Sequence, residues 1–260
     1  MNWLEAVILG ILQGLSEFLP VSSSGHLEIG KALFGIDAEH SLIFTVVVHG
    51  ATVLSTIVVF RKDLWILFRD IFAFKWNESL KFNTKLFISM VPVIILGLFF
   101  LEEVESFFNG NVVFVGAMLI LTAILLASTY LIKSNKRDIT FLDSLIIGIA
   151  QAVAVLPGLS RSGATISTGL LIGNKREALT RFSFLMVLVP VIGANAKEIL
   201  DHNLLSQSDI GITTLILGFV AAFISGLLAC KWMITIVKKG NLLYFSIYCL
   251  IIGIIAIILG

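Results

Sequence analysis

Long apolar stretches run through the chain and are separated by short polar segments. Six of them come close to the roughly 20 residues that a helix needs to cross the hydrocarbon core of a bilayer. They cover residues 42–60, 86–101, 111–132, 182–199, 212–230 and 241–259. No polar segment is long enough to build a soluble domain, so we predict one all-α, polytopic membrane domain over residues 1–260.

Two further apolar regions, residues 3–35 and 141–173, are each interrupted by a polar, helix-breaking segment. The first interruption reads Leu-Pro-Val-Ser-Ser-Ser-Gly-His over residues 19–26, and the second reads Leu-Pro-Gly-Leu-Ser-Arg-Ser-Gly-Ala-Thr over residues 156–165. The halves on either side hold about 14–17 residues, which is marginal or short for a full span. Because a membrane tolerates such segments only against protein or along a watery cavity, we predict two broken or re-entrant helix pairs that form one polar site.

The composition agrees with this pattern. Hydrophobic residues make up 58% and charged residues 13% of the 260-residue chain, and the mean hydropathy of +1.03 excludes an ordinary soluble domain. Cys230 and Cys249 lie in apolar segments and provide neither a disulfide framework nor metal-ligand spacing. Residues 1–19 contain Glu5 and Glu17 and lack a basic start, so we do not expect a cleaved signal peptide. No basic stripe with stacking aromatics indicates nucleic-acid binding.

The charges between the apolar stretches predict the orientation. Segments 102–110 and 200–211 carry acidic residues and no Lys or Arg, whereas Lys and Arg gather in segments 61–85, 133–140, 174–181 and 231–240. Because basic loops stay in the cytoplasm, residues 3–35 enter and leave from outside, and residues 141–173 enter and leave from the cytoplasm. Both termini then lie outside. Lys31 is a small exception to the charge rule, because it is a basic residue on the outer side. The amphipathic, aromatic segment 62–77 predicts a cytoplasmic interfacial helix.

The two interrupted regions align when the chain is shifted by 138 positions. Matching polar residues and glycines are harder to obtain by chance than matching leucines. The shift pairs Gly10 with Gly148, Gln13 with Gln151, Ser22 with Ser160, Ser24 with Ser162, Gly25 with Gly163, Gly35 with Gly173 and Phe44 with Phe182. Each half, about residues 1–135 and 139–260, has one re-entrant pair followed by three spans, and an odd number of spans reverses the second half. We predict an inverted-topology repeat whose broken helices meet near the bilayer midplane.

The first interruption carries candidate chemical groups. Gln13 and Glu17 are four residues apart and share one face of the helix before Pro20. An ionisable group in an apolar run indicates function by default, although a solvated carboxylate near the interface is the simpler alternative for Glu17. The serines at positions 22, 23 and 24 can hold an anion or merely cap the next helix.

Histidines are the next candidates. A lone histidine such as His26 is more often a hydrogen-bonded structural residue, but an imidazole near a phosphate can act as a nucleophile or a general acid or base. His49 is a weaker candidate. His40 and His202 fall in loops, where we expect them to be solvated.

The second interruption centres on Arg161. Its guanidinium is flanked by Ser160 and Ser162, with Thr165 one turn further along. Together with the free N–H groups of a starting helix, these side chains form a cradle suited to phosphate. The sequence therefore predicts an anion site to which one interruption contributes Glu17 and the other contributes Arg161.

These residues resemble the motifs of a known family, the bacterial undecaprenyl-diphosphate phosphatases linked to bacitracin resistance. Residues 13–26 read Gln-Gly-Leu-Ser-Glu-Phe-Leu-Pro-Val-Ser-Ser-Ser-Gly-His, and residues 157–165 read Pro-Gly-Leu-Ser-Arg-Ser-Gly-Ala-Thr. Both motifs are long and specific, and the similarity runs along the whole chain. The resemblance implies a multi-pass protein of the bacterial cytoplasmic membrane that hydrolyses undecaprenyl diphosphate to undecaprenyl phosphate. It also implies recycling of the peptidoglycan lipid carrier, bacitracin resistance, a site open to the outer, periplasmic face, and a divalent cation, Mg²⁺ or Ca²⁺.

The resemblance implies roles for individual residues. Glu17, Ser23, His26 and Arg161 match the catalytic set, with Glu17 as the expected metal ligand. The residues expected to bind the diphosphate are Gln13, Ser22, Ser24, Ser160, Ser162 and Thr165. Because the first motif begins with Gln13, Glu17 is its only carboxylate, which disfavours a two-carboxylate metal site. Thr45 stands where relatives often have an acidic residue, so no such role transfers to it.

Two questions stay open at the level of sequence. The attacking group is a serine of the 22–24 cluster, with Ser23 first, or His26, or an activated water molecule. Broken helices in an inverted repeat are also typical of secondary transporters, so a flippase for the lipid phosphate is the alternative function. A polyprenyl diphosphate lipid and the bilayer are the expected partners, and a homodimer is one assembly that the sequence leaves open.

Overall fold

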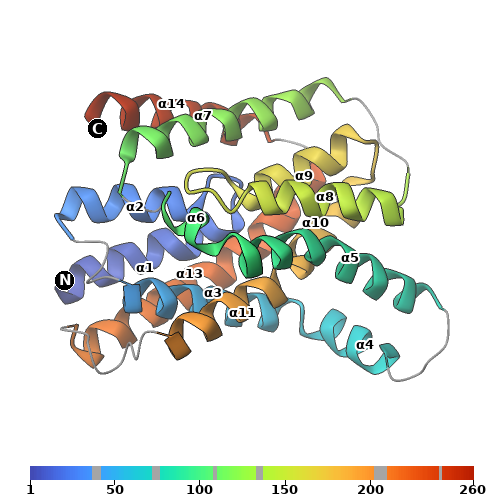
Figure 1. Cartoon of the computed structure of the whole chain (residues 1–260), viewed down its shortest axis with the longest axis horizontal. Helices are drawn as coiled ribbons and strands as arrows, with labels where there is room; N and C mark the ends of the chain where they lie inside the picture. The colour runs from blue at the N-terminus through green and yellow to red at the C-terminus, as the bar shows by residue number, and fades with distance from the viewer. Residues whose placement is uncertain (37–41, 72–76, 108–109, 133–136, 202–209, 240–241) are drawn as a thin grey trace.

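The computed structural model describes residues 1–36, 42–71, 77–107, 110–132, 137–201, 210–239 and 242–260. Within these ranges the chain is helical apart from loops and one isolated β-bridge between Arg137 and Asn174, so the predicted all-α class is confirmed (Figure 1). In chain order the helices are α1 (Trp3–Phe18), α2 (Ser23–Phe34), α3 (Leu42–Val59), α4 (Arg61–Ile71), α5 (Glu78–Phe99), α6 (Leu101–Glu105), α7 (Val112–Ser128), η2 (Thr129–Leu131), α8 (Phe141–Val153), α9 (Arg161–Leu171), α10 (Arg176–Met186), α11 (Leu188–Asp201), α13 (Ile212–Lys239) and α14 (Leu243–Leu259).

Within the described ranges, five helical segments are long and apolar enough to cross a membrane, so the chain is a multi-pass membrane protein. They cover Leu42–Val59, Glu78–Phe99, Val112–Leu131, Arg176–Lys197 and Ile212–Val237 and match five of the predicted spans. α5 starts at Glu78, ahead of the predicted residue 86, because the Asn77 side chain caps it. The sixth predicted span, residues 241–259, forms the 17-residue α14, which is shorter than the others.

Both predicted interruptions break the helices. α1 ends before Leu19 and Pro20, and α2 begins after the N-cap residue Ser22. α8 ends at Val153, and α9 begins after the N-cap residue Ser160. The four arms hold 16, 12, 13 and 11 residues, which is too short for any of them to cross a bilayer alone.

The two broken pairs use equivalent capping residues. Each first arm starts with a capping box, and each second arm starts with a serine whose Oγ accepts a hydrogen bond from the N–H three residues on. Each pair ends near a glycine with positive φ. The equivalent positions are Asn2 and Thr140, Glu5 and Asp143, Ser22 and Ser160, and Gly35 and Gly173. The predicted sequence similarity of the two regions is therefore matched in their local backbone.

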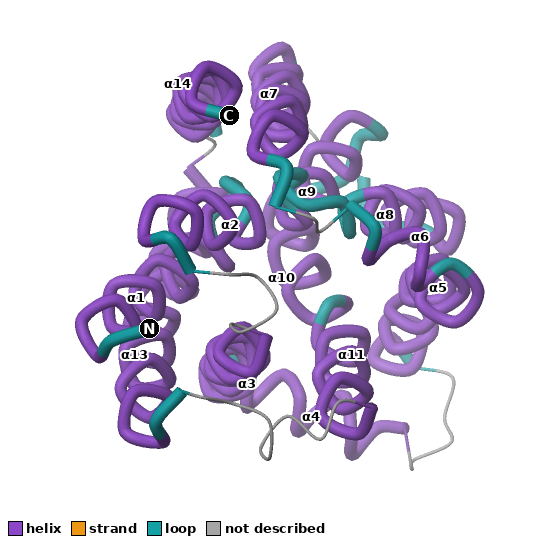
Figure 2. Tube along the Cα trace, turned by 60° about the vertical axis from the view of Figure 1, so that its left-hand side comes forward, coloured by secondary structure: helices purple, strands orange, loops and turns teal. Residues whose placement is uncertain are grey.

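Each first arm packs against a helix from the other half of the chain. α1 lies along α13, and α8 lies along α5, while α7 pairs with α14 (Figures 1 and 2). Gly10 faces the backbone of Gly218, and Gly148 faces the backbone of Ser89, because small residues let helices approach closely. Each first arm is thus held on one face by a longer helix, while side chains such as Leu4 and Ile8 on α1 and Leu142 and Ile149 on α8 stay exposed.

The two interruptions also meet each other. A Cβ at Gly25, in the first turn of α2, would lie 2.9 Å from the Cα of Gly158 in the second interruption. The Ser162 hydroxyl donates to the Leu19 carbonyl at 3.3 Å. These contacts confirm the prediction that both interruptions contribute to one region.

The predicted interfacial segment 62–77 begins as the separate helix α4, and residues 72–76 lie outside the described residues. Leu67 is buried, whereas Trp65 and Phe68 are exposed. Asp63 pairs with Arg181 at 2.8 Å and anchors α4 to α10. α4 lies at the end of the bundle opposite the two termini (Figure 1).

Replacing Gly158 with alanine tests how closely the interruptions must pack. Gly158 has a φ of +92°, and a Cβ there would meet the Val115 carbonyl oxygen. We expect Gly158→Ala to reduce the free energy of unfolding by about 1–3 kcal/mol, measured as a lower midpoint of thermal unfolding in detergent. Gly50→Ala is the matched control, because a Cβ at Gly50 inside α3 meets open space and alanine favours a helix. Equal midpoints for the two variants would contradict the close packing.

Candidate active site

The Glu17 carboxylate, in the last turn of α1, is the centre of a polar cluster. Its Oε1 accepts a hydrogen bond from Arg161 Nη2 at 2.6 Å. Its Oε2 accepts from Ser23 Oγ at 2.5 Å and from Gln13 Nε2 at 3.0 Å. His49 Nε2, from α3, lies 4.0 Å from the same oxygen. One carboxylate therefore connects α1, both interruptions and α3.

The ion pair between Glu17 and Arg161 is largely removed from solvent. The side chains are 12% and 24% exposed, respectively. Charges in such surroundings lose most of their hydration, and a short charge-assisted hydrogen bond offsets part of that loss. Removing one partner would leave the other charge without compensation, so the two interruptions depend on each other electrostatically.

The N-termini of α2 and α9 start beside this ion pair. Ser22 Oγ lies 3.3 Å from Ser24 Oγ, and Ser160 Oγ lies 3.3 Å from Ser162 Oγ. Among the described non-glycine residues, Ser22 is the one with positive φ, at +68°. A strained backbone of this kind persists where the surrounding structure requires it, and it is common at functional sites. The two helix starts place N–H groups and hydroxyls around one position, which is an arrangement that binds anions.

A cavity of about 760 Å³ opens beside the cluster. Its volume is typical of a site for a small molecule or a cofactor. The polar part of its wall consists of Ser16, Glu17, Ser22, Ser23, Ser24, Glu28, Lys31, Thr45, His49, Gln151, Ser160, Arg161, Ser162, Asn195 and Lys197. The apolar part includes Leu27, Leu42, Val46, Val93, Ile94, Leu96, Leu98, Val189 and Val191. Such a wall suits a molecule with an anionic head and an apolar tail.

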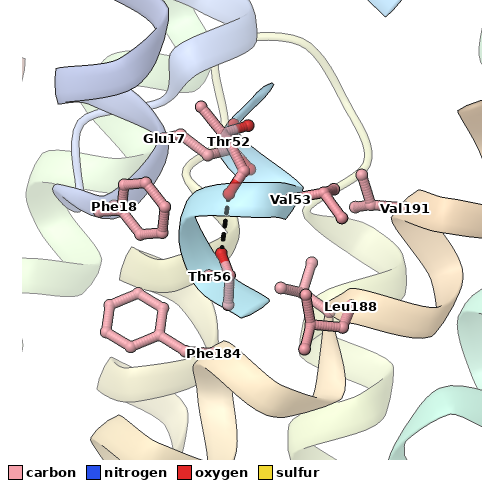
Figure 3. Close-up of a pocket in the computed structure, with 9 residues that line it drawn as sticks. Glu17, Phe18, Thr52, Val53, Thr56, Phe184, Leu188 and Val191 are labelled. Atoms are coloured by element: carbon pink, nitrogen blue, oxygen red, sulfur yellow. Dashed lines mark hydrogen bonds between the residues drawn. The ribbon is translucent and has the colours of Figure 1, made fainter. Parts of the chain in front are cut away.

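A second cavity of about 20 Å³ also borders Glu17 (Figure 3). Apart from Glu17 and two threonines, its lining is apolar and consists of Phe18, Val53, Phe184, Val187, Leu188 and Val191. The hydroxyls of Thr52 and Thr56 donate to the backbone carbonyls of His49 and Thr52 and so add no free polar group. This smaller cavity is therefore mostly apolar, and the larger cavity is the polar approach to the carboxylate.

The predicted site residues fall into two groups. Ser23, Arg161 and Gln13 all donate hydrogen bonds to Glu17, and the wall of the larger cavity includes the serines at 22, 24, 160 and 162. His26 and Thr165 are outside the lining that the described residues provide.

His26 is engaged on both ring nitrogens. Nδ1 donates to the Ser22 carbonyl at 2.8 Å, and Nε2 lies 2.8 Å from the hydroxyl of Tyr248, whose ring stacks on the imidazole at 5.5 Å. Thr165 donates to the Arg161 carbonyl at 2.8 Å and lies 2.6 Å from Ser183 Oγ. Both residues therefore support the backbone around the site in this structure.

Sequence reasoning missed several groups in the cavity wall. His49 ranked below His26, yet it faces Glu17. Gln151 is buried and its Nε2 has no hydrogen-bond partner among the described residues. Its pairing with Gln13 in the internal repeat was a signal that could have identified it. His40 and His202 lie outside the described residues.

The described residues contain no group of three or more His, Cys, Asp or Glu side chains that could hold a metal ion. Glu17 provides the hard oxygen donors that Mg²⁺ and Ca²⁺ prefer, but both oxygens already accept hydrogen bonds. These side chains do not form a complete resident metal site, and a divalent cation would need most of its ligands from elsewhere.

The sequence matches the model of the family described as "Bacitracin resistance protein BacA" over residues 6–255. The chain belongs to this family. It is 52% identical over 266 residues to an undecaprenyl-diphosphatase of Bacteroides fragilis, with 100% of the chain and 99% of the relative covered. Undecaprenyl-diphosphatases of Christiangramia forsetii and Methanosphaera stadtmanae are 51% and 37% identical, with 99% and 100% of the chain and 98% and 99% of the relatives covered. The family that the two motifs predicted is confirmed.

Breaking the ion pair tests the electrostatic dependence of the two interruptions. We expect Arg161→Met to lower the free energy of unfolding by about 3 kcal/mol, because the Glu17 carboxylate would stay buried without a counter-charge. Adding Glu17→Gln to this variant should restore most of the loss. Thermal unfolding of both single variants and the double variant in detergent measures the coupling. Losses that simply add would show that the two side chains act independently.

Proposed function

We propose that this chain hydrolyses undecaprenyl diphosphate to undecaprenyl phosphate and inorganic phosphate, recycling the peptidoglycan lipid carrier and conferring bacitracin resistance. The supporting observation is the Glu17–Arg161 ion pair. It places the Glu17 carboxylate, which accepts a hydrogen bond from the Ser23 hydroxyl, against the Arg161 guanidinium beside two helix N-termini. Cleavage of a diphosphate needs anion-binding donors and an activated nucleophile at one place. The names of the relatives and the mixed polar and apolar cavity wall support the same reaction.

The second interruption is proposed to hold the terminal phosphate. Arg161 can exchange its bond to Glu17 for a bidentate contact with phosphate oxygens. The first N–H groups of α9 and α2 add donors, and the hydroxyls of Ser22, Ser24, Ser160 and Ser162 complete the cradle. Gln13 keeps its bond to Glu17 and so holds the carboxylate in place.

Ser23 is the proposed nucleophile, because its hydroxyl already donates to Glu17 and it lines the cavity. Glu17 takes the hydroxyl proton while Ser23 Oγ forms a bond to the terminal phosphorus. The bond from that phosphorus to the bridging oxygen breaks, and undecaprenyl phosphate leaves with the proton. Water then attacks the phosphoserine, Glu17 accepts its proton and returns it to Ser23, and inorganic phosphate is released. His26 is proposed to position the serine segment through its bond to the Ser22 carbonyl, with Thr165 supporting Arg161.

The divalent cation, Mg²⁺ or Ca²⁺, is proposed to arrive with the diphosphate, because Glu17 is the one carboxylate that the described residues place in the cluster with Arg161 and Ser23. When bound, such a cation neutralises charge on the phosphate oxygens. Chelation should therefore stop hydrolysis, and activity that persists in excess chelator would contradict a cation requirement.

The inverted-topology repeat and a site open to the outer face are also proposals. The repeat is supported by the matched caps, by the packing of α1 on α13 and α8 on α5, and by broken helix pairs that start from opposite ends of the bundle (Figure 1). The opening to the outer face is supported by the loop charges, which put the acidic segments 102–110 and 200–211 outside. A membrane-impermeant maleimide on intact cells should label Glu103→Cys but not Lys175→Cys. Cys230 and Cys249 are buried and should give little background. Equal labelling would contradict this orientation.

Phosphate release from undecaprenyl diphosphate by the purified protein in detergent tests the activity. We expect Arg161→Lys to lose about 100-fold or more in rate, because a point charge replaces a bidentate fork at the reacting phosphate. Arg137→Lys is the matched control. Arg137 pairs with Asp143 at a distance of 2.8 Å, and neither residue lines the cavity, so this variant should retain activity. Transbilayer movement of lipid phosphate without phosphate release would favour the flippase instead.

Trapping the intermediate tests the nucleophile. Rapid acid quench of a reaction with substrate labelled in the terminal phosphate should give a labelled protein, and peptide mapping should place the label on Ser23. Ser23→Ala should abolish both label and turnover, whereas Ser24→Ala should keep the label. Turnover by Ser23→Ala without any adduct would assign the attack to water.

A further inference from the structure

A second buried ion pair lies in the wall of the same cavity. Lys31 Nζ donates to Glu28 Oε1 at 3.1 Å, and the two side chains are only 7% and 11% exposed. Ser24, Leu27, Glu28 and Lys31 all line the cavity. These positions follow one another at helical spacing on one face of α2. The cavity therefore extends along α2 from the serine segment toward the last turn of the helix.

Helix stabilisation does not account for this pair. Glu78 and Lys81 on α5 have the same spacing and a 2.8 Å bond, but their side chains are 88% and 35% exposed and keep their hydration. Glu28 and Lys31 have instead lost most of their hydration, which costs more than a surface pair of this kind contributes. Ionisable side chains that face a cavity within a membrane segment indicate a ligand that uses them.

The direction of the Lys31 side chain leads toward the candidate active site. Side chains on an α-helix tilt toward its N-terminus, which here is the serine segment. The contact with Glu28, one turn earlier, agrees with this direction. Lys31, Arg161 and His49 all line this same cavity.

We propose that Lys31 binds the phosphate that stays on the lipid, while Arg161 and the two helix starts bind the phosphate that is removed. This assignment rests on the proposed diphosphatase activity. Each cation is paired with one carboxylate, Arg161 with Glu17 and Lys31 with Glu28, and a diphosphate can replace both carboxylates. A flexible ammonium with three donors suits the lipid-linked phosphate, which is held but not attacked.

The two products separate the two positions. Undecaprenyl phosphate retains only the phosphate assigned to Lys31, and inorganic phosphate is the group assigned to Arg161. Lys31 should therefore determine how tightly the lipid product is held and have little effect on inorganic phosphate.

The test measures inhibition by each product, with hydrolysis followed as conversion of labelled lipid by the purified full-length protein in detergent. We expect Lys31→Met to raise the inhibition constant of undecaprenyl phosphate about tenfold, the effect of losing one charge-assisted hydrogen bond, and to leave that of inorganic phosphate unchanged. Lys31→Arg should keep most of the affinity, and the matched variant Lys81→Met should behave as wild type.

An unchanged constant for undecaprenyl phosphate in Lys31→Met would overturn the proposal. An equal weakening of both products would also overturn it, because that is a general charge effect. If Lys31→Met does not fold, the variant Glu28→Gln is measured in its place. It should bind undecaprenyl phosphate more tightly, because the carboxylate that competes with phosphate for Lys31 is removed. Wild-type protein that binds undecaprenyl phosphate without hydrolysing the diphosphate would contradict the proposed function alone, and titration of that lipid would still test Lys31.

Discussion

A carboxylate and a guanidinium from opposite halves of the chain meet at 2.6 Å inside a largely apolar bundle, and the arrangement of the helices keeps this pair away from lipid. Neither charge is tolerable against lipid, so both have to face protein or a cavity. The helices that carry them stop short, because only a broken helix presents its terminal N–H groups to an anion at this depth. The same breaks that make the site polar make the arms too short to span the bilayer.

Shelter for these arms comes from close backbone contact. Gly10 and Gly14 allow α1 to lie directly on α13, and Gly148 does the same for α8 on α5. Helices in a membrane gain no hydrophobic free energy from associating with each other, so packing of small residues provides the attraction. The polar cluster therefore requires short arms, and the glycine-lined contacts hold these arms in the bundle.

The sequence predicted those features that depend on local pattern. Hydrophobic length identified the spans, and Pro157 with its neighbours identified a break, because these signals act within a single segment. The family motifs brought Glu17, Ser23 and Arg161 together correctly. The direction of a side chain was harder to predict. His26 turns toward Tyr248, more than two hundred positions away, and His49 turns toward Glu17. Such choices are made by tertiary neighbours, and no local pattern records them. From the sequence, Lys31 is an exception to the rule that basic residues stay on the cytoplasmic side. The structure explains it, because Lys31 is buried in the cavity wall.

The exchanged packing of α1 with α13 has a consequence for how the protein is made. α1 leaves the ribosome well before its partner α13, which covers Ile212–Lys239. Until α13 and Arg161 have been synthesised, α1 exposes a glycine-lined face, and Glu17 has no counter-charge. Until then, the amino-terminal half is an incomplete structure in the membrane. The contact between α1 and α13 is long-range in sequence, so this part of the fold can form only after α13 has been made. A chain truncated before α13 would lack the helix on which α1 packs.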